Sequence, residues 1–455
     1  MAGVPDSVKN GDPVRTGLVR ARARPAAAFA AGRRAWISRA GATRLPGVFL
    51  PGCSVALLRL IAAFCLSTAA LAAEPDRPYG VDYHARFLPE EGYVAARLEV
   101  DQSLRRLVEL NFEAPQTRYG HFEGDGDIRR DGDRLIWEVP RKGGELRYRV
   151  KADHQRSGAS DARLTGDWSI VRLDDLFPPV RVRSRVRSYS EARLYLQGPA
   201  DWSFETRYGP VDEDGVAVDT QGRRFDRPLG WMAAGDLGIR RSRIAGRRVA
   251  IAGPKDQGFR RMDMLTFLHW TLPELTRIAP SFPERLVIVG GSRDMWRGGL
   301  SGPGSLYVHP DRPLVSGNST STLLHELMHV ASEEPPEKGA DWIAEGLAEY
   351  YSLVILLRTG GISGRRFEHS LEWLEHWVRE EGGRLADPST GADTARAVLL
   401  FRDLDLELRE AGGSLDAVAA KLLNGRVSVA RLGRLVREIL GGPSDVLARV
   451  LEDEG

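Results

Sequence analysis

The sequence predicts an α+β protein in which an N-terminal antiparallel β domain precedes a mainly helical domain. Short runs of β-forming residues, separated by Gly, Asp and Pro, fill residues 74–244. From residue 245 onward, apolar residues recur mostly with the 3.6-residue period of helices. A chain of 455 residues is long enough for both domains, 74–244 and 245–455, after a leader at 1–73.

Four segments of the first domain alternate in polarity or are rich in β-forming residues. They are 93–100, 134–139, 146–150 and 192–196. No helical period intervenes, so we expect these strands to pair as antiparallel neighbours. Arginines at every second position from Arg181 to Arg187 predict one charged strand face, with an anion site as the alternative.

The second domain begins with two expected strands, 249–251 and 286–289, on either side of a helix at 258–278. Pro273 is expected to break or kink this helix, because proline lacks an N–H and crowds the preceding turn. Amphipathic helical segments follow beyond residue 360. These segments are 371–378, 394–408, 415–423, 427–440 and 443–452.

Residues 1–73 are typical of a leader that contains a signal peptide. Arg59 precedes an apolar region at 60–73, which ends in small residues. We expect cleavage near Ala72, which predicts an exported protein, periplasmic or extracellular, with no stable membrane span. The alternative is an uncleaved N-terminal membrane anchor, although the apolar run is short for a span.

Charge and cysteine content narrow the functions of the remaining chain. Residues 1–72 hold ten Lys or Arg and two Asp, which leaves 54 basic and 60 acidic residues beyond them. This balance gives no reason to expect nucleic acid or an anionic membrane as a partner. Because Cys53 and Cys65 both lie in the leader, a metal site further on needs His and carboxylate ligands.

The pattern His-Glu-x-x-His at 325–329 predicts a metal site on a helix. His325 and His329 lie one helical turn apart, which suits two imidazole ligands of one Zn²⁺ ion. Glu326 is rotated away from them and can activate a zinc-bound water without being a ligand. Ser and Thr residues at 319–322 suit the start of this helix. The alternative is a buried helix with two histidines that only satisfy hydrogen bonds.

A second helical segment, 341–351, carries two acids one turn apart. Glu345 is the candidate third zinc ligand, because a catalytic zinc needs a third protein donor and an open position. Glu349 can accept a hydrogen bond from a ligating imidazole. The alternative is two solvated acids on a surface helix.

These two motifs resemble the gluzincin metallopeptidases. His325-Glu326-x-x-His329 followed by Trp342-x-x-Glu345-Gly346 and Tyr350-Tyr351 is most similar to the glycyl aminopeptidase family, and more distantly to the aminopeptidase N-like family. The resemblance implies a thermolysin-like catalytic domain, with zinc on His325, His329 and Glu345 and with Glu326 as general base. It also implies a small sheet before the zinc helix whose edge strand lines the cleft.

The chain departs from the family pattern at two functional positions. Ser301 stands where the glycyl aminopeptidases carry a Glu that binds the substrate's amino group, so we doubt aminopeptidase specificity. The family's oxyanion Tyr falls near Asp393 or Thr394, and no Tyr follows Tyr351. We also expect no PDZ domain after the helices.

Other residues are candidates for substrate or oxyanion contacts. They are His309, Tyr350 and Tyr351, with His369 and His376 as further replacement donors. His309 is expected either in the cleft or on the surface.

The sequence therefore predicts a zinc metallopeptidase that acts on peptides or proteins. One alternative is a secreted zinc-binding, peptidase-like protein with weak or no catalysis that binds peptides or a partner. Another is a structural protein with a chance motif.

Overall fold

The structure is a computed structural model that describes residues 77–156, 158–218, 224–332 and 334–453. Residues from Glu74 onward form one compact unit. The expected leader at 1–73, with its signal peptide, lies outside the described residues. No helix in the described ranges combines the length and the apolar character that a membrane crossing needs.

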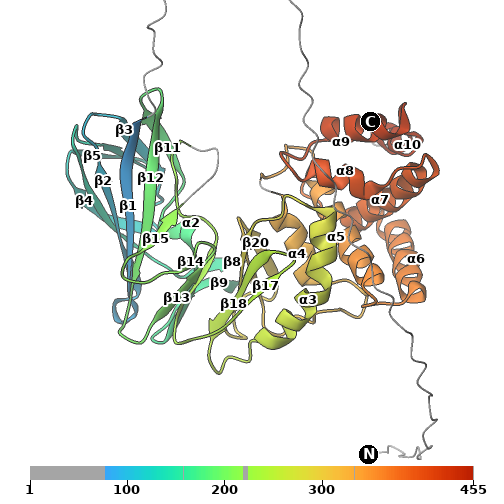
Figure 1. The fold of residues 1–455 in the computed structure, drawn as a ribbon, viewed down its shortest axis with the longest axis horizontal. Coiled ribbons are helices and arrows are strands. Elements are labelled where there is room, and N and C mark those ends of the chain that lie inside the picture. Colours follow the sequence, from blue (N-terminus) through green and yellow to red (C-terminus); the bar gives the residue numbers. More distant parts are fainter. Residues whose placement is uncertain (1–76, 157, 219–223, 333, 454–455) are drawn as a thin grey trace, which may run out of the picture. The chain divides into compact units, whose positions relative to one another are not determined.

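Three sheets make up the first part of the fold, and they occupy the β-rich half of Figure 1. The first sheet has the order β15-β12-β1-β2-β7-β4, the second β11-β3-β6-β5 and the third β14-β13-β16-β10-β9-β8. The strands of the first sheet are β1 Arg77–Leu88, β2 Tyr93–Asp101, β4 Tyr119–Gly124, β7 Gly143–Val150, β12 Ser188–Gln197 and β15 Val216–Val218. Those of the second are β3 Leu107–Glu113, β5 Asp127–Asp131, β6 Arg134–Glu138 and β11 Val180–Ser184.

The third sheet links the first two to the rest of the chain. Its strands are β8 His154–Arg156, β9 Ala159–Leu164, β10 Trp168–Arg172, β13 Ser203–Thr206, β14 Gly209–Pro210 and β16 Trp231–Gly235. The short helices η1 Pro89–Glu91 and α2 Leu173–Leu176 complete this part.

The expected β domain is present, and one of its pairings corrects the prediction of an antiparallel fold. β1 runs parallel to β12, from Arg77 beside Ser188 to Arg86 beside Gln197. About a hundred residues separate these strands, which leaves room for the crossover that parallel strands require. The alternating arginines lie on and after β11, where Arg181 and Arg183 are exposed, as a charged strand face predicts.

A fourth, five-stranded sheet precedes the helices, in the order β17-β18-β19-β21-β20. Its strands are β17 Leu237–Ile244, β18 Arg247–Pro254, β19 Arg285–Val289, β20 Gly299–Gly302 and β21 Ser305–Val308. β17 and β18 form a hairpin, so the expected domain boundary at 244/245 falls in its turn. β20 stands at one end of the sheet and pairs with β21 alone among the described strands.

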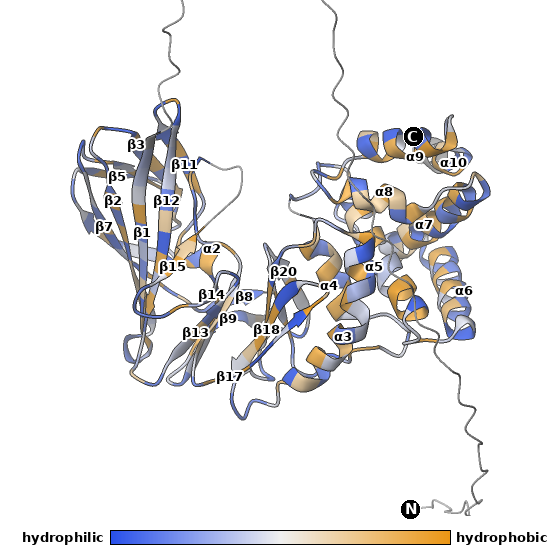
Figure 2. Cartoon of the chain, in the orientation of Figure 1, coloured by the Kyte–Doolittle hydropathy of each residue, from blue (hydrophilic) through white to orange (hydrophobic). Residues whose placement is uncertain are grey.

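The helices that follow α3 each carry apolar and polar residues, as the mixed colours in Figure 2 show. The helices are α3 Arg261–Ile278, α4 Thr322–Val330, α5 Asp341–Arg358, α6 Gly364–Glu381, α7 Ala392–Glu410, α8 Leu415–Leu422, α9 Val429–Leu440 and α10 Asp445–Asp453. Pro273 does not end α3, contrary to one of the two expected outcomes. Leu272 and Leu275 are buried on either side of it, and their packing outweighs the backbone hydrogen bond that proline removes.

Candidate metal centre

Helix α4 buries its apolar residues and brings two histidines together. Ser321 caps the helix, since its side-chain oxygen accepts a hydrogen bond from the Leu324 N–H at 3.3 Å. The buried residues of α4 are Leu323, Leu324, Leu327, Met328 and Val330. His325 and His329 lie one turn apart, with their Nε2 atoms separated by 3.1 Å.

Glu345 on α5 reaches both imidazoles. Its Oε2 lies 3.3 Å from His325 Nε2, and its Oε1 lies 3.3 Å from His329 Nε2. The next residue, Gly346, allows α5 to pack closely on α7, because a Cβ atom there would lie 2.5 Å from the Cβ of Ala397. The Glu-Gly pair thus directs one carboxylate to the histidines while the adjacent backbone meets the neighbouring helix.

Glu349, one turn after Glu345, contacts the other ring nitrogen of His325. Its Oε2 lies 3.0 Å from His325 Nδ1. When the Nδ1–H donates to this carboxylate, the lone pair that remains on the ring is at Nε2. Glu349 therefore favours the tautomer and ring orientation that a metal-binding histidine needs.

The carboxylates favour positive charge at this point of the protein. Burial alone would lower the pKa of His325, but hydrogen bonds to Glu345 and Glu349 outweigh it and raise the pKa to about 10. Burial alone would raise the pKa of Glu345, but hydrogen bonds to His325 and His329 hold it well below its usual range. A bound cation would compete with these protons for the same donors.

The three donors have the spacing of zinc ligands. Zinc with four ligands at about 2.0–2.1 Å requires neighbouring donors about 3.3–3.4 Å apart. The measured separations among the two Nε2 atoms and the Glu345 oxygens are 3.1, 3.3 and 3.3 Å. The three side chains are 18, 20 and 27% exposed, so solvent can reach a fourth position. His325, His329 and Glu345 are also the one group in the described chain with the residue types and spacing of a metal site.

Glu326 lies beside the end strand of the small sheet. A Cβ atom on Gly299 of β20 would lie 2.5 Å from Glu326 Cγ and 3.0 Å from its Oε1. The same position would lie 2.9 Å from Cγ2 of Thr322. The N-terminal half of α4 therefore packs directly on β20, and the Glu326 carboxylate lies at the unpaired edge of the sheet.

The residues at the two departures from the family pattern lie in β20 and at the start of α7. Ser301 lies in β20, half-buried. Asp393 Oδ1 accepts a hydrogen bond from the Arg384 N–H at 2.7 Å. The hydroxyl of Thr394 lies 3.2 Å from that of Ser389. These contacts tie the start of α7 to the loop before it.

His309 lies in the protein interior and not on the surface, which was one of its two expected places. Its side chain is buried at 1% exposure. The Asp311 N–H donates to Nδ1 at 3.1 Å, so Nε2 carries the proton and donates to the Arg293 carbonyl at 3.1 Å. Both ring nitrogens are engaged, which gives His309 a structural role in the turn after β21.

Tyr350 and Tyr351 are brought to neighbouring helices rather than to the histidines. The Tyr350 hydroxyl donates to Asp405 on α7 at 3.2 Å, and that of Tyr351 donates to Asp416 on α8 at 3.1 Å. Both rings are buried. The remaining histidine candidates, His369 and His376, are exposed on α6.

Sequence reasoning missed two glycines that shape the centre, Gly299 and Gly346. Gly346 occurs inside the second motif that identified the site, whereas Gly299 lies outside both motifs. A signal was present at 346, because glycine inside a helix costs about 1 kcal/mol relative to alanine and so indicates a packing constraint.

Comparison with known proteins identifies solved structures that share this fold. Neither a family model nor a curated protein matches the sequence. An aminopeptidase N family protein from Idiomarina loihiensis matches 82% of this chain and 73% of its own, at a TM-score of 0.57 and 13% identity. An M1 zinc metallopeptidase from Deinococcus radiodurans matches 83% of this chain and 92% of its own, at a TM-score of 0.53 and 13% identity.

The chain therefore shares the fold of M1 zinc metallopeptidases, a β-sheet domain followed by a helical domain. At this identity the likeness is one of fold. The narrower similarity to glycyl aminopeptidases rests on the motifs alone.

Proposed function

We propose that this protein is a zinc-dependent metallopeptidase that hydrolyses peptide bonds. The observation that carries the proposal is the spacing of His325, His329 and Glu345. The two Nε2 atoms lie 3.1 Å apart, and each lies 3.3 Å from one oxygen of Glu345. Glu349 supports the set by orienting His325. Zinc held by these residues would act as a Lewis acid on the scissile carbonyl and on the attacking water.

Glu326 is the general base of the proposed reaction. It takes a proton from the attacking water and later delivers that proton to the leaving amine. Among the described residues, no hydrogen bond or ion pair engages its carboxylate, and the carboxylates that contact the histidines are those of Glu345 and Glu349. The adjacent edge of β20 supports a peptide as substrate, since an extended chain can add to an unpaired strand.

The proposal does not include aminopeptidase specificity. Ser301 is uncharged and cannot neutralise an ammonium group in the way that a carboxylate does. We therefore expect N-acetylated peptides to be cleaved as readily as peptides with a free amino terminus.

A second candidate is a zinc-binding, peptidase-like protein with weak or no catalysis. It is favoured by the placement of the expected oxyanion donors. The hydroxyls of Tyr350 and Tyr351 bind Asp405 and Asp416, and both nitrogens of His309 are engaged. Loss of one oxyanion donor costs about 2.7–4 kcal/mol of barrier in a hydrolase.

Digestion of a peptide library separates the two candidates. Zinc-loaded wild type and Glu326→Gln are incubated with free and N-acetylated peptides, and products are identified by mass spectrometry. The proposal predicts cleavage by wild type and none by Glu326→Gln at equal zinc content. Cleavage by the variant would remove Glu326 from the mechanism, and an inactive, zinc-loaded wild type would favour the second candidate.

A further inference from the structure

The outward face of the first sheet carries charges that are sorted along its strands. The register of β1, β2 and β7 aligns their outward side chains in four rows. The rows are Arg86, Ala95 and Arg149; then His84, Arg97 and Arg147; then Asp82, Glu99 and Glu145; then Gly80, Asp101 and Gly143. The neighbouring strand β12 adds Gln197, Tyr195, Arg193 and Glu191 to the same rows in turn.

The first two rows form what we call the basic end, and the last two form the acidic end. These four strands place four arginines and no carboxylate at the basic end. They place five carboxylates and one arginine, Arg193, at the acidic end. Glu123 of β4, beside Arg147, is the exception at the basic end.

The charges in the middle of the face are paired, whereas those in the outer rows are not. Arg97 and Arg147 both form ion pairs with Glu145, the first at 3.1 Å. Within the described ranges, no ion pair involves the charged residues of the first and fourth rows. These residues are Arg86, Arg149, Asp101 and Glu191, and all four are exposed. The guanidinium of Arg149 lies over the Tyr93 ring, with Cζ 4.4 Å from the ring centroid. In the described chain, the charges of the outer rows are therefore not neutralised by an ion pair and can pair with charges on another molecule.

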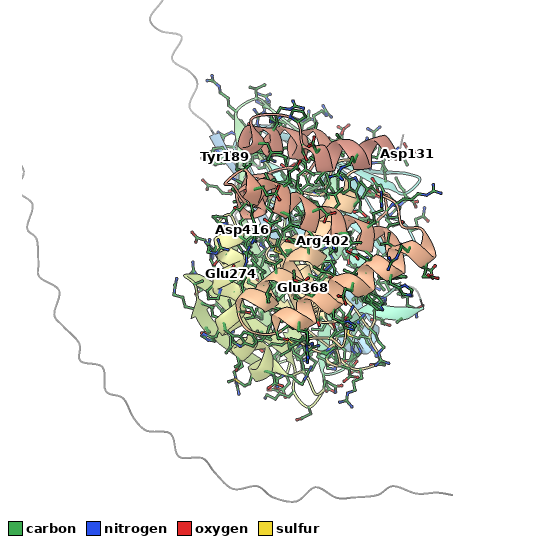
Figure 3. All side chains as sticks on the ribbon, turned by 90° about the vertical axis from the view of Figure 1, so that its right-hand side faces the viewer. Asp131, Tyr189, Glu274, Glu368, Arg402 and Asp416 are labelled. Carbon is green, nitrogen blue, oxygen red and sulfur yellow. The ribbon has the colours of Figure 1, made fainter. Side chains whose placement is uncertain are left out.

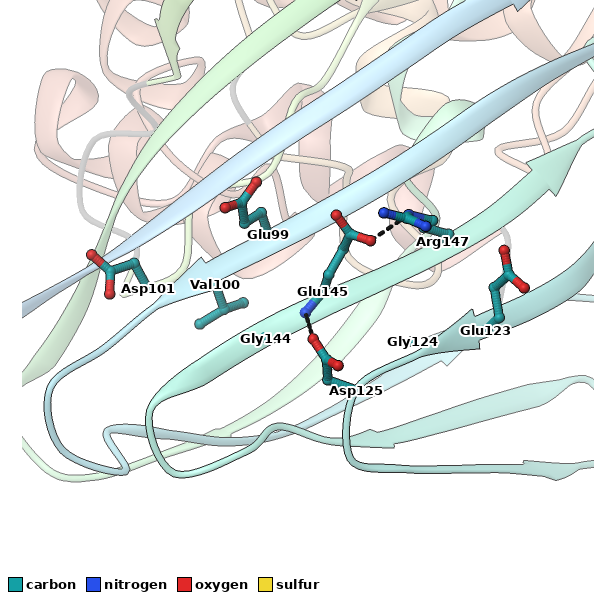
Figure 4. A pocket seen from close by; sticks show the side chains of 9 residues that line it. All are labelled: Glu99, Val100, Asp101, Glu123, Gly124, Asp125, Gly144, Glu145 and Arg147. Atoms are coloured by element: carbon teal, nitrogen blue, oxygen red, sulfur yellow. Dashed lines mark hydrogen bonds and ion pairs between the residues drawn. The ribbon is translucent and has the colours of Figure 1, made fainter.

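Each end is also hollowed. The hollow at the acidic end has a volume of about 740 Å³, and Figure 4 shows Glu99, Asp101 and Glu145 among its lining residues. The hollow at the basic end has a volume of about 570 Å³. Ala95 is one of its lining residues and lies between Arg86 and Arg149 in the same row.

We propose that this face is a two-fold symmetric interface that binds a second copy of this chain. A two-fold axis that crosses the strands in the plane of contact lays the first row of each copy on the fourth row of the other. Arg86 and Arg149 then meet the positions of Gly80 and Gly143 in the second copy. They lie on either side of its Asp101, which itself falls over the short side chain of Ala95.

The two inner rows are complementary under the same operation. His84 faces Asp82 of the second copy, and Arg97 faces its Glu99. Arg147 faces the Glu145 of the second copy, which can then share its charge between two chains. Because sheets twist, this match is closest on the central strands β1 and β2.

The face is large enough for a weak, polar interface. The face consists of β12, β1, β2, β7 and β4, and one spacing of about 4.8 Å for each of these five strands and about 6.8 Å for each of the four rows gives roughly 24 Å by 27 Å. The resulting planar area of about 650 Å² per copy approaches the ~800 Å² that each partner contributes to a standard interface. Because the contacts are charged and not apolar, salt is expected to weaken the dimer.

Charge reversal at each end tests the proposal. Sedimentation velocity of the full chain at about 20 mM and about 500 mM NaCl should show a dimer whose dissociation constant rises at least about tenfold with salt. The double variant Arg86→Glu, Arg149→Glu makes both outer rows acidic, and Asp101→Lys, Glu191→Lys makes both outer rows basic. Each should be monomeric alone, and an equimolar mixture should form a heterodimer.

The matched control is Arg129→Glu, Arg181→Glu, which makes the same charge change at exposed positions of the second sheet. This control should dimerise as wild type does, and thermal melts should show that all variants fold. A wild type that stays monomeric at low salt would overturn the proposal. It would do so even if inorganic phosphate were found to bind the basic end. A mixture of the two reversed variants that stays monomeric would overturn it as well.

Discussion

A substitution at Glu349 tests how the orientation of a zinc ligand affects zinc affinity, because Glu349 contacts His325 and is not itself a proposed ligand. It touches the nitrogen of His325 that faces away from Glu345 and His329, at 3.0 Å. The variant Glu349→Gln keeps the shape of the side chain but removes its charge, so the imidazole is held less firmly and is a weaker donor. We expect zinc affinity to fall about 10–100-fold, measured with a competing chelator.

Two other substitutions serve as controls for this measurement of zinc affinity. Glu345→Gln removes a proposed ligand and should lower zinc affinity further, whereas Glu372→Gln on the exposed face of α6 should leave it unchanged. An unchanged affinity in Glu349→Gln would show that the contact with His325 has no part in metal binding.

Ser301 offers a test of specificity at a single position. Ser301→Glu restores the carboxylate that the resembled family carries there. A charge-assisted hydrogen bond contributes about 1.5–3 kcal/mol, which corresponds to roughly tenfold or more. The ratio of kcat/KM for free over N-acetylated peptides should therefore rise about tenfold in the variant, and an unchanged ratio would place residue 301 outside the amine-binding position.

At this scale the sequence predicted His325, His329 and Glu345 as one group, but it missed the partners of the two tyrosines, which lie on other helices. His325 and His329 are one turn apart on a single helix, so their spacing alone predicted their proximity. Tyr350 was a candidate for the site, but its hydroxyl binds Asp405, which lies 55 residues further along the chain. Only the packing of α5 against α7 decides this contact, and no local pattern encodes that packing.

At the scale of elements, a cluster of ion pairs connects α5 with α3 and α8. Arg358 of α5 binds Asp416 of α8 at 2.8 Å and Glu274 of α3 at 3.0 Å. Arg277 of α3 binds the same Asp416 at 2.7 Å. Figure 3 labels Glu274 and Asp416 on adjacent helices. Because α5 also carries Glu345, this cluster helps to hold the proposed ligand in place.

Asp416→Asn should destabilise the protein in a pH-dependent way. Burial alone would raise the pKa of Asp416, but hydrogen bonds from Arg358 and Arg277 outweigh it and lower the pKa below its usual 3.8. A depressed pKa stabilises the fold above the unfolded value and loses this effect as pH falls through the folded value. The variant should lose about 2–3 kcal/mol at pH 7.

Urea unfolding at pH 7 and at pH values below 4 checks the sign. The difference between wild type and Asp416→Asn should shrink as the pH falls, because the wild-type carboxylate becomes protonated. A difference that stays constant or grows at low pH would contradict the assignment of the stability to this ionised group.

Helices and strands were predicted well where the sequence pattern is local. They were predicted less well where strands far apart in the sequence pair with one another. The helix at 258–278 was predicted to within three residues, but its continuation through Pro273 depends on the burial of Leu272 and Leu275. The parallel pairing of β1 and β12 has no counterpart in the sequence pattern, because strand alternation looks the same in either direction.

At the scale of the whole molecule, one apolar cluster joins the third β sheet to the sheet that precedes α4. Trp231 of β16 and Tyr307 of β21 lie with ring centroids 5.5 Å apart. The backbone N–H of Trp231 donates to the Ser305 hydroxyl at 2.8 Å. Composition predicted two domains but not this shared cluster, which makes the described chain beyond Glu74 one compact unit.

Removal of zinc should lower the thermal stability of this unit. An ion that binds only the folded state stabilises it by about 3–4 kcal/mol at 100–1,000 times its dissociation constant. Scanning calorimetry with and without a chelator should show a lower Tm after chelation, restored by added zinc. In Glu345→Gln the chelator should have little effect, and an equal shift in that variant would point to zinc bound elsewhere.

The central claim is that His325, His329 and Glu345 bind a single zinc ion. The most direct test is a crystal structure of the zinc-loaded protein with anomalous diffraction recorded at the zinc edge. We expect one peak within about 2.0–2.2 Å of the Nε2 atoms of both histidines and of a Glu345 oxygen, with Glu326 unbound. A peak elsewhere, or none at these three residues, would contradict it.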